Sequence, residues 1–274
     1  MALFIPTNSQ LSPAEARVEA EFAEAIRADL EGFVRRYLER FGPMIDTDRA
    51  RELCPVYSES EAARTLWSRA VYNPAKALAD EIYRRMVRAP APAFGSSILF
   101  TSGGTGVGKS TALAQLSDDD TPAEERYDLL VDGTLSDLAA ARAKVRQALA
   151  LGHRVTIVHV HREFLETIRM VVQRALEMGR AVTLDNIAAT HFRSRETLFK
   201  LIEEFGDRIE VEIFENSTRR EIRSLSPAEL AGVAGKEVDD LRKQAHVFFQ
   251  HEFGSLETSH PGIYSAFRQS GSRR

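Results

Sequence analysis

The chain of 274 residues is long enough for one large domain with additions or for two small domains. Its hydrophobic share of 43% and its charged share of 28% are those of an ordinary globular protein. A net charge of −4 provides no general attraction to nucleic acid or to an anionic membrane, which argues against both as partners.

The sequence also indicates a compartment. Cys54 is the only cysteine, which excludes an internal disulfide and a thiolate metal cage and fits a reducing environment. The opening residues lack the basic and apolar regions of a signal peptide, and no apolar stretch approaches membrane-spanning length. We therefore expect a cytoplasmic location.

The N-terminal third has a helical pattern. Residues 12–15, Ser-Pro-Ala-Glu, form a capping box with proline at the first helical position. Apolar residues then recur at helical spacing as far as Phe41, and Gly42 with the proline after it ends the pattern. These features predict a long helix up to Phe41.

Two further helices are predicted before the middle of the chain, starting near Ser58 and at Asn73. Alternating alanine and proline at 89–93 then breaks regular structure and is typical of a short, semi-rigid linker. We predict a helical N-terminal module over 1–90, separated by this linker from a nucleotide-binding domain.

The strongest motif of the chain follows the linker. A short apolar strand at 98–100 precedes residues 103–110, which match G-x-x-x-x-G-K-[ST], and a helix begins after them. In this context successive backbone amides wrap around a polyphosphate, and the helix N-terminus adds partial positive charge. The alternative, a glycine-rich turn that fits by chance, does not explain the strand and helix on either side. The predicted nucleotide-binding residues are Gly103, Gly104, Thr105, Gly106, Val107, Gly108, Lys109, Ser110 and Thr111.

Two side chains of this loop have defined roles in such motifs. Lys109 is expected to reach the β- and γ-phosphates, and the Ser110 hydroxyl is expected to bind Mg²⁺. ATP and Mg²⁺ are therefore the predicted cofactors.

Strand and helix patterns alternate after the loop, which is typical of a parallel sheet in βαβ units. We predict an α/β fold of the phosphate-loop type, three-layer αβα with a mainly parallel sheet, over residues 91–225. Helical segments flank it at both ends, and the C-terminal extension over 226–274 has a frayed tail. The patterns indicate strands at 127–132, 154–160 and 209–214, with helices at 138–151, 163–178 and 196–205.

Asp132 ends the first strand after the loop, and ligands of open α/β sheets bind beyond the carboxyl ends of the strands. An acid at this place can approach Mg²⁺ or a substrate hydroxyl. The alternative is a turn or N-cap aspartate in Asp-Gly-Thr.

Arg174 and Arg180 lie at the end of the 163–178 helix and just after it, where small neighbours leave room. Arginines near a nucleotide bind the transferred phosphoryl group and spread its charge. The alternative is a solvated helix face.

Residues 97–216 resemble the zeta toxin family, ATP-dependent small-molecule kinases of the phosphate-loop class. Three stretches carry the resemblance: the phosphate loop at 103–111, the strand and turn LLVDGTL at 129–135, and the strand, lid helix and Gly-Arg continuation from 154 to 182. The resemblance implies that Lys109 and Ser110 bind nucleotide and metal and that Asp132 and Thr134 face the substrate sugar. It also implies that Arg174 and Arg180 bind the phosphates.

The family phosphorylates a hydroxyl of UDP-N-acetylglucosamine, and a small protein antitoxin inhibits many members. In this chain the resemblance therefore implies a nucleotide-sugar acceptor and an antitoxin partner. A nucleotide-binding regulatory module without kinase activity is the alternative function.

One departure concerns the catalytic base. In the family, a strand ending in Asp-x-Arg lies between the phosphate loop and the Glu-Gly-Thr strand, and its aspartate is the base. Only 22 residues separate Lys109 from Asp132 here, too few for an extra strand and helix. Either Asp132 or the acidic run at 118–120 supplies the base, or the chain binds nucleotide without this reaction.

Overall fold

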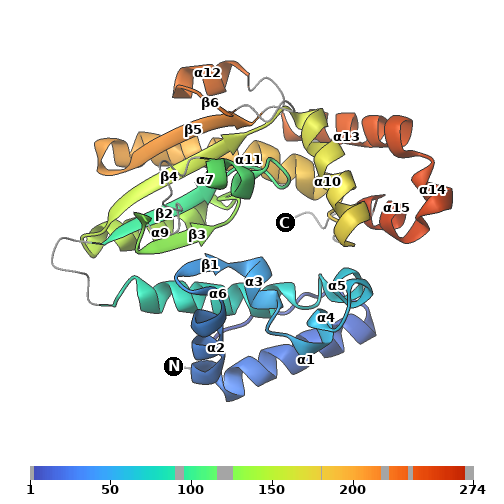
Figure 1. The fold of residues 1–274 in the computed structure, drawn as a ribbon, viewed down its shortest axis with the longest axis horizontal. Coiled ribbons are helices and arrows are strands. Elements are labelled where there is room, and N and C mark those ends of the chain that lie inside the picture. Colours follow the sequence, from blue (N-terminus) through green and yellow to red (C-terminus); the bar gives the residue numbers. More distant parts are fainter. Residues whose placement is uncertain are drawn as a thin grey trace.

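The computed structural model describes residues 3–89, 96–115, 126–179, 181–216, 222–233 and 237–268. Most of the described chain is helical, around one sheet (Figure 1). In chain order the elements are α1 (Pro13–Ala28), α2 (Leu30–Phe41), β1 (Met44–Asp46), α3 (Thr47–Arg51), α4 (Pro55–Ser58), α5 (Glu61–Trp67), α6 (Tyr72–Met86), β2 (Ser97–Ser102), α7 (Lys109–Gln115), β3 (Leu129–Asp132), α9 (Leu138–Ala150), β4 (Arg154–His161), α10 (Phe164–Met178), α11 (Leu184–Phe205), η1 (Gly206–Arg208), β5 (Glu210–Asn216), β6 (Ile222–Ser224), α12 (Pro227–Gly232), α13 (Val238–Phe253), α14 (Leu256–Ser259) and α15 (Pro261–Arg268).

The six strands of the sheet lie in the order β1-β3-β2-β4-β5-β6. Neighbouring strands from β1 to β5 run parallel, and β6 pairs with β5 in the antiparallel direction. The predicted α/β fold with a mainly parallel sheet is confirmed. Because the parallel strands point the same way, their carboxyl ends gather at one edge of the sheet.

Strand β1 comes from the N-terminal segment, where only helices were predicted. It pairs with β3, so that Ile45 lies beside Val131 and Asp46 beside Asp132. The sequence pattern missed it because β1 has three residues, too few to show a period. The segment before the phosphate loop therefore supplies one edge of the sheet.

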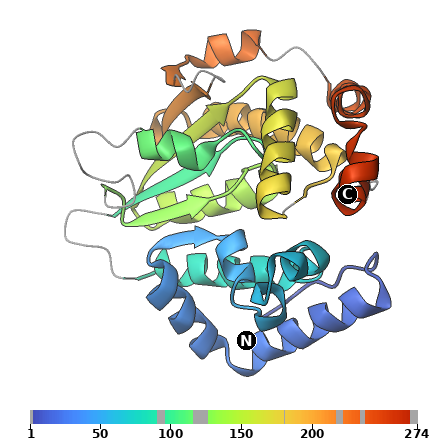
Figure 2. The ribbon, with the colours of Figure 1, turned by 45° about the vertical axis from the view of Figure 1, so that its right-hand side comes forward.

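Helices cover both faces of the sheet (Figure 2). Alternate residues of a strand point to opposite faces and so toward these two layers. On one face Leu99 packs with residues of α7 in one buried cluster. On the other face Ile98 and Phe100 belong to a larger cluster shared with α6, α9 and α11. The phosphate-loop helix and the long helices thus hold the sheet between them.

Two helix boundaries differ from the prediction. The helix predicted up to Phe41 is two helices in the structure, α1 and α2, with Asp29 between them. The Asp29 carboxylate caps α2 by accepting the Gly32 amide at 3.0 Å. Helix α11 begins at Leu184, well before the predicted start at Glu196, and Thr183 caps it by accepting the Asn186 amide at 3.2 Å. Asp29 therefore separates two helices although the apolar residues continue at helical spacing past it.

The C-terminal helices pack against α10 and the start of α11. Residues of α13, α14 and α15 join α10 and the start of α11 in a separate apolar cluster. The division into domains at 90 and 225 stays a prediction, and both the linker after Ala89 and the tail after Arg268 lie outside the described residues. Among the helices described, none combines the length and apolar content needed to cross a lipid bilayer.

Candidate active site

The phosphate loop connects β2 to α7, as its motif predicts. Gly103 has a φ of 131°, and a Cβ there would lie 2.4 Å from the carbonyl oxygen of Val160. A Cβ on Gly104 would lie 2.9 Å from the Cα of His191. The loop is pressed between β4 and α11, so both positions require glycine.

Four neighbouring elements hold the loop backbone. The Gly103 amide donates to the carbonyl of Thr134 at 3.2 Å, and the Thr105 amide donates to the hydroxyl of Thr190 at 3.2 Å. The carbonyl of Val107 accepts the buried side-chain amide of Asn216 at 3.0 Å and the Arg162 Nε at 3.4 Å. The shape of the loop is thus fixed by the turn after β3, by α11, by β5 and by the residue that follows β4.

The first turn of α7 offers backbone amides to a ligand. Ala112 is the first residue whose amide finds a helical acceptor, the carbonyl of Gly108 at 2.9 Å. The amides of the preceding residues have no acceptor within their own helix, as at any helix N-terminus. Ser110 and Thr111 are exposed there. This donor set fits a polyphosphate.

The Lys109 ammonium lies over the loop, with Nζ 3.3 Å from each of the carbonyl oxygens of Gly103 and Gly104. Burial lowers the pKa of Lys109, and the negative charges of Asp132 and Asp46 oppose that shift. The charges of Asp132 and of Asp46, a carboxylate that the sequence did not single out, therefore both act on Lys109.

Asp132 ends β3, and the hydroxyl of Thr101 on β2 orients its side chain. This hydroxyl donates to Asp132 Oδ1 at 2.5 Å and accepts the Gly133 amide at 2.9 Å. The next turn contains Thr134, whose hydroxyl contacts Ser136 Oγ at 2.8 Å. Leu135 has a φ of 47°, a left-handed conformation that is uncommon without glycine and often marks a functional turn.

Asp46 and Asp48 are the residues that sequence reasoning missed. Asp46 lies beside Asp132 in register, and its Oδ1 accepts the Asp48 amide at 2.8 Å. Burial, with the negative charges of Asp48 and Asp132, raises the pKa of Asp46 from 3.8 to about 7. The sequence does contain one indication of this site: residues 44–46 are two apolar residues followed by an acid, the same order as at the end of β3.

The arginines are only partly described. Arg174 is exposed on α10, close enough for its charge to act on Lys109. Arg169, on the same helix, instead faces the C-terminal extension, with its guanidinium over the Phe248 ring and 3.7 Å from Glu252. Arg180 and the acidic run at 118–120 lie outside the described residues.

The histidines beneath the loop are structural. His159 and His191 are buried, and burial lowers the pKa of each to about 3, so both are neutral. His159 Nδ1 lies 2.9 Å from the hydroxyl of Ser102. Within the described residues no cluster of three or more acids, histidines or cysteines is arranged to hold a metal ion.

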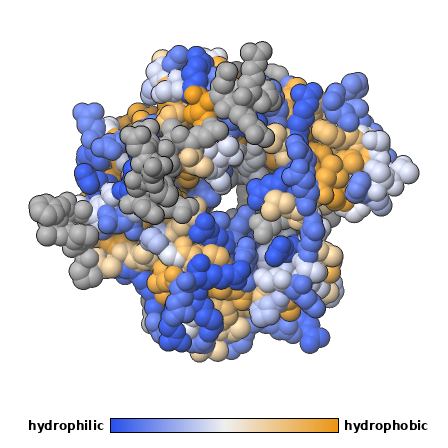
Figure 3. All heavy atoms as spheres, in the orientation of Figure 1, coloured by the Kyte–Doolittle hydropathy of each residue, from blue (hydrophilic) through white to orange (hydrophobic). Residues whose placement is uncertain are grey.

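The N-terminal segment and α10 meet across the site. The Thr65 hydroxyl of α5 donates to the carbonyl of Gly179, directly after α10. Figure 3 shows a hollow at the centre of this face, between the N-terminal helices below and the sheet with its helices above.

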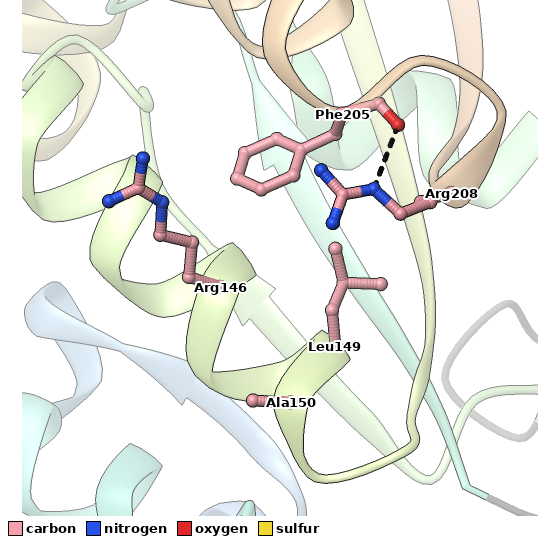
Figure 4. A pocket seen from close by; sticks show the side chains of 5 residues that line it. All are labelled: Arg146, Leu149, Ala150, Phe205 and Arg208. Atoms are coloured by element: carbon pink, nitrogen blue, oxygen red, sulfur yellow. Dashed lines mark hydrogen bonds between the residues drawn. The ribbon is translucent and has the colours of Figure 1, made fainter.

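A second depression, between the ends of α9 and α11, lies near the start of β4 and so at the opposite edge of the sheet (Figure 4). Its Arg146 pairs with Glu204 at 2.8 Å, and its Arg208 donates to the carbonyl of Phe205 at 3.3 Å. Because both arginines already have partners, we assign this depression no ligand.

A parallel sheet whose glycine loop leads from a strand into a helix defines a phosphate-loop protein. Residues 119–224 of the chain match the family model described as Zeta toxin. The match runs from before β3 to β6, and it confirms the resemblance predicted from the sequence.

Some solved structures show a weak likeness to the whole chain. One comes from work on the PezAT chromosomal toxin-antitoxin system of Streptococcus pneumoniae, with 12% identity, a TM-score of 0.41, and coverage of 89% of this chain and 98% of that one. The native AvrRxo1-ORF1:-ORF2 complex has 12% identity, a TM-score of 0.45, and coverage of 97% and 93%. Likenesses of this strength do not indicate what this chain binds. No curated protein matches the chain.

Proposed function

We propose that this chain is an ATP- and Mg²⁺-dependent phosphotransferase of the zeta toxin-like class, which transfers the γ-phosphate to a hydroxyl group of a small molecule. One observation carries the proposal: Asp46 and Asp132 lie side by side at the carboxyl edge of the sheet, and both act on the charge of Lys109 in the phosphate loop. One of these acids can approach Mg²⁺ or a substrate hydroxyl, which leaves the other to act as a base.

The phosphate loop is proposed to bind the nucleotide. The amides of 103–111 hold the phosphates, Lys109 leaves its carbonyl contacts to bind the β- and γ-phosphates, and Ser110 takes Mg²⁺. The metal supplies positive charge that neutralises the phosphate oxygens. Arg174 and Arg180 are proposed to bind the phosphoryl group as it moves, since both follow from the resemblance and Arg174 is near Lys109.

The two carboxylates are proposed to act on the acceptor. Asp132 and Thr134 are proposed to orient the acceptor, because Thr101 fixes Asp132 and the turn after it fixes Thr134. Asp46 is proposed to take the proton. The acceptor oxygen bonds to the γ-phosphorus, the bond from that phosphorus to the ADP oxygen breaks, and the hydroxyl proton passes to the Asp46 carboxylate.

Asp46 suits this step better than an ordinary aspartate. A base works best when its pKa lies near the working pH, and the pKa of Asp46 is raised to about 7. It also lies on β1, the strand next to β3. The family pattern places its base on a strand that this chain lacks between the phosphate loop and β3, and β1 is proposed to take the place of that strand. The proposed base therefore precedes the phosphate loop in the chain.

The family resemblance suggests the finer identity. We propose a nucleotide sugar such as UDP-N-acetylglucosamine as the acceptor and a small protein antitoxin as the inhibitor.

The test is phosphate transfer from γ-labelled ATP to a panel of nucleotide sugars. Lys109→Ala should abolish transfer, while Lys200→Ala is the matched control because Lys200 is exposed on α11 and pairs with Glu203 at 2.9 Å. Tight ATP binding with no transfer to any acceptor would refute the kinase and favour the regulatory module.

A further inference from the structure

Strand β1 lies at the edge of the sheet in the described structure, with β3 on its inner side. In a parallel ladder, successive residues direct their backbone groups alternately to the two sides of the strand. The Leu130 amide of β3 donates to the carbonyl of Pro43 at 3.1 Å, so Met44 and Asp46 direct their backbone groups outward. A three-residue strand with open outward groups would be weakly held.

The hydroxyl of Tyr37 occupies this outer side. Tyr37 belongs to α2 and is fully buried. Its oxygen accepts the Asp46 amide at 2.8 Å and lies 2.9 Å from the carbonyl oxygen of Met44, to which it donates. Burial raises the pKa of the Tyr37 phenol, so the donated proton is kept.

The Tyr37 side chain thus makes the hydrogen bonds that a further strand would make to β1. A residue opposite Ile45 on such a strand would donate its amide to Met44 and accept the amide of Asp46. The Tyr37 hydroxyl makes both bonds, and it does so at the residue whose carboxylate faces Asp132 and Lys109.

We propose that Tyr37 is the positioning residue for Asp46, and this inference rests on the proposed phosphotransferase function. The hydroxyl fixes the end of β1 and thereby holds the Asp46 carboxylate beside the acceptor. Tyr37 touches neither nucleotide nor acceptor and acts only through the backbone of β1. Its loss should therefore reduce transfer and leave ATP binding intact.

The experiment compares Tyr37→Phe with Tyr83→Phe in the full chain. Tyr83 is the matched control, because it is equally buried and its hydroxyl donates to one backbone carbonyl, that of Lys144 at 2.7 Å. Tyr37→Phe should lower kcat by about tenfold, keep the Kd for ATP within about twofold, and speed amide hydrogen exchange at Asp46. Tyr83→Phe should leave kcat and the exchange at Asp46 unchanged.

Equal effects of the two variants on kcat would overturn the inference, because a general loss of stability would then explain both. Unchanged exchange at Asp46 in Tyr37→Phe would overturn it as well. If the wild-type chain binds ATP but transfers no phosphate, the proposed function fails, and the positioning role fails with it. Normal transfer by Tyr37→Phe with faster exchange at Asp46 would refute the positioning role alone.

Discussion

Replacement of Asp46 by asparagine should make the protein more stable and at the same time inactive. The pKa of this carboxyl is raised from 3.8 to about 7, mainly by burial. The folded protein therefore keeps the proton to higher pH than the unfolded chain does. As the pH rises from 3.8 to about 7, the folded state loses stability. Above about pH 7 the full free-energy cost of the ionised carboxylate remains.

The magnitude follows from the size of the shift. Each pKa unit corresponds to about 1.4 kcal/mol, so an ionised Asp46 costs the folded state at most about 4 kcal/mol. Because the side chain is partly exposed, we expect about 2 kcal/mol in practice. Asp46→Asn removes this cost, and removal of the base should slow transfer by about 10²- to 10⁴-fold.

Urea denaturation of the wild type and of Asp46→Asn, at about pH 4 and about pH 8, measures the effect. The variant should be the more stable of the two at the higher pH and should match the wild type at the lower. Asp80→Asn is the control of opposite sign: burial alone would raise the pKa of Asp80, but Lys144 and Lys76 hold it below its usual value. That variant should lose stability at the higher pH. If Asp46→Asn is less stable than the wild type at both pH values, the reasoning about this carboxylate is wrong.

Three further predictions concern the loop and the base. Gly104→Ala places a Cβ 2.9 Å from the backbone of His191, so ATP affinity measured by calorimetry should fall by at least about tenfold while the circular dichroism spectrum stays native. Asn216→Ala removes the 3.0 Å bond to the carbonyl of Val107 and should cost about 1 to 2 kcal/mol in urea denaturation; an unchanged midpoint would show that the bond is not needed. The kcat/KM of the wild type should rise with pH through about 7 as Asp46 loses its proton, and a flat profile would exclude Asp46 as the base.

The nucleotide side of the site was predictable because its information is local. The residues 103–110 are contiguous, and the strand and helix on either side follow from short apolar patterns. Asp132 was also within reach, since the end of a buried parallel strand marks the ligand-binding edge of the sheet. The structure places it at that edge, oriented by Thr101.

The acceptor side was not predictable in the same way. Asp46 meets Asp132 only through pairing of β1 with β3, a long-range contact that no local pattern records. The family pattern places its acidic strand after the loop, where this chain is too short to contain it. The roles of Tyr37 and Asn216 likewise depend on contacts between distant segments, which only the folded chain brings together.

The place of β1 in the chain separates two tasks that share one site. The phosphate loop that is proposed to hold ATP lies after α6, whereas the proposed base and the helices around it come before β2. A single recombination event at that junction would exchange the proposed base and leave the phosphate loop, Asp132 and Thr134 intact.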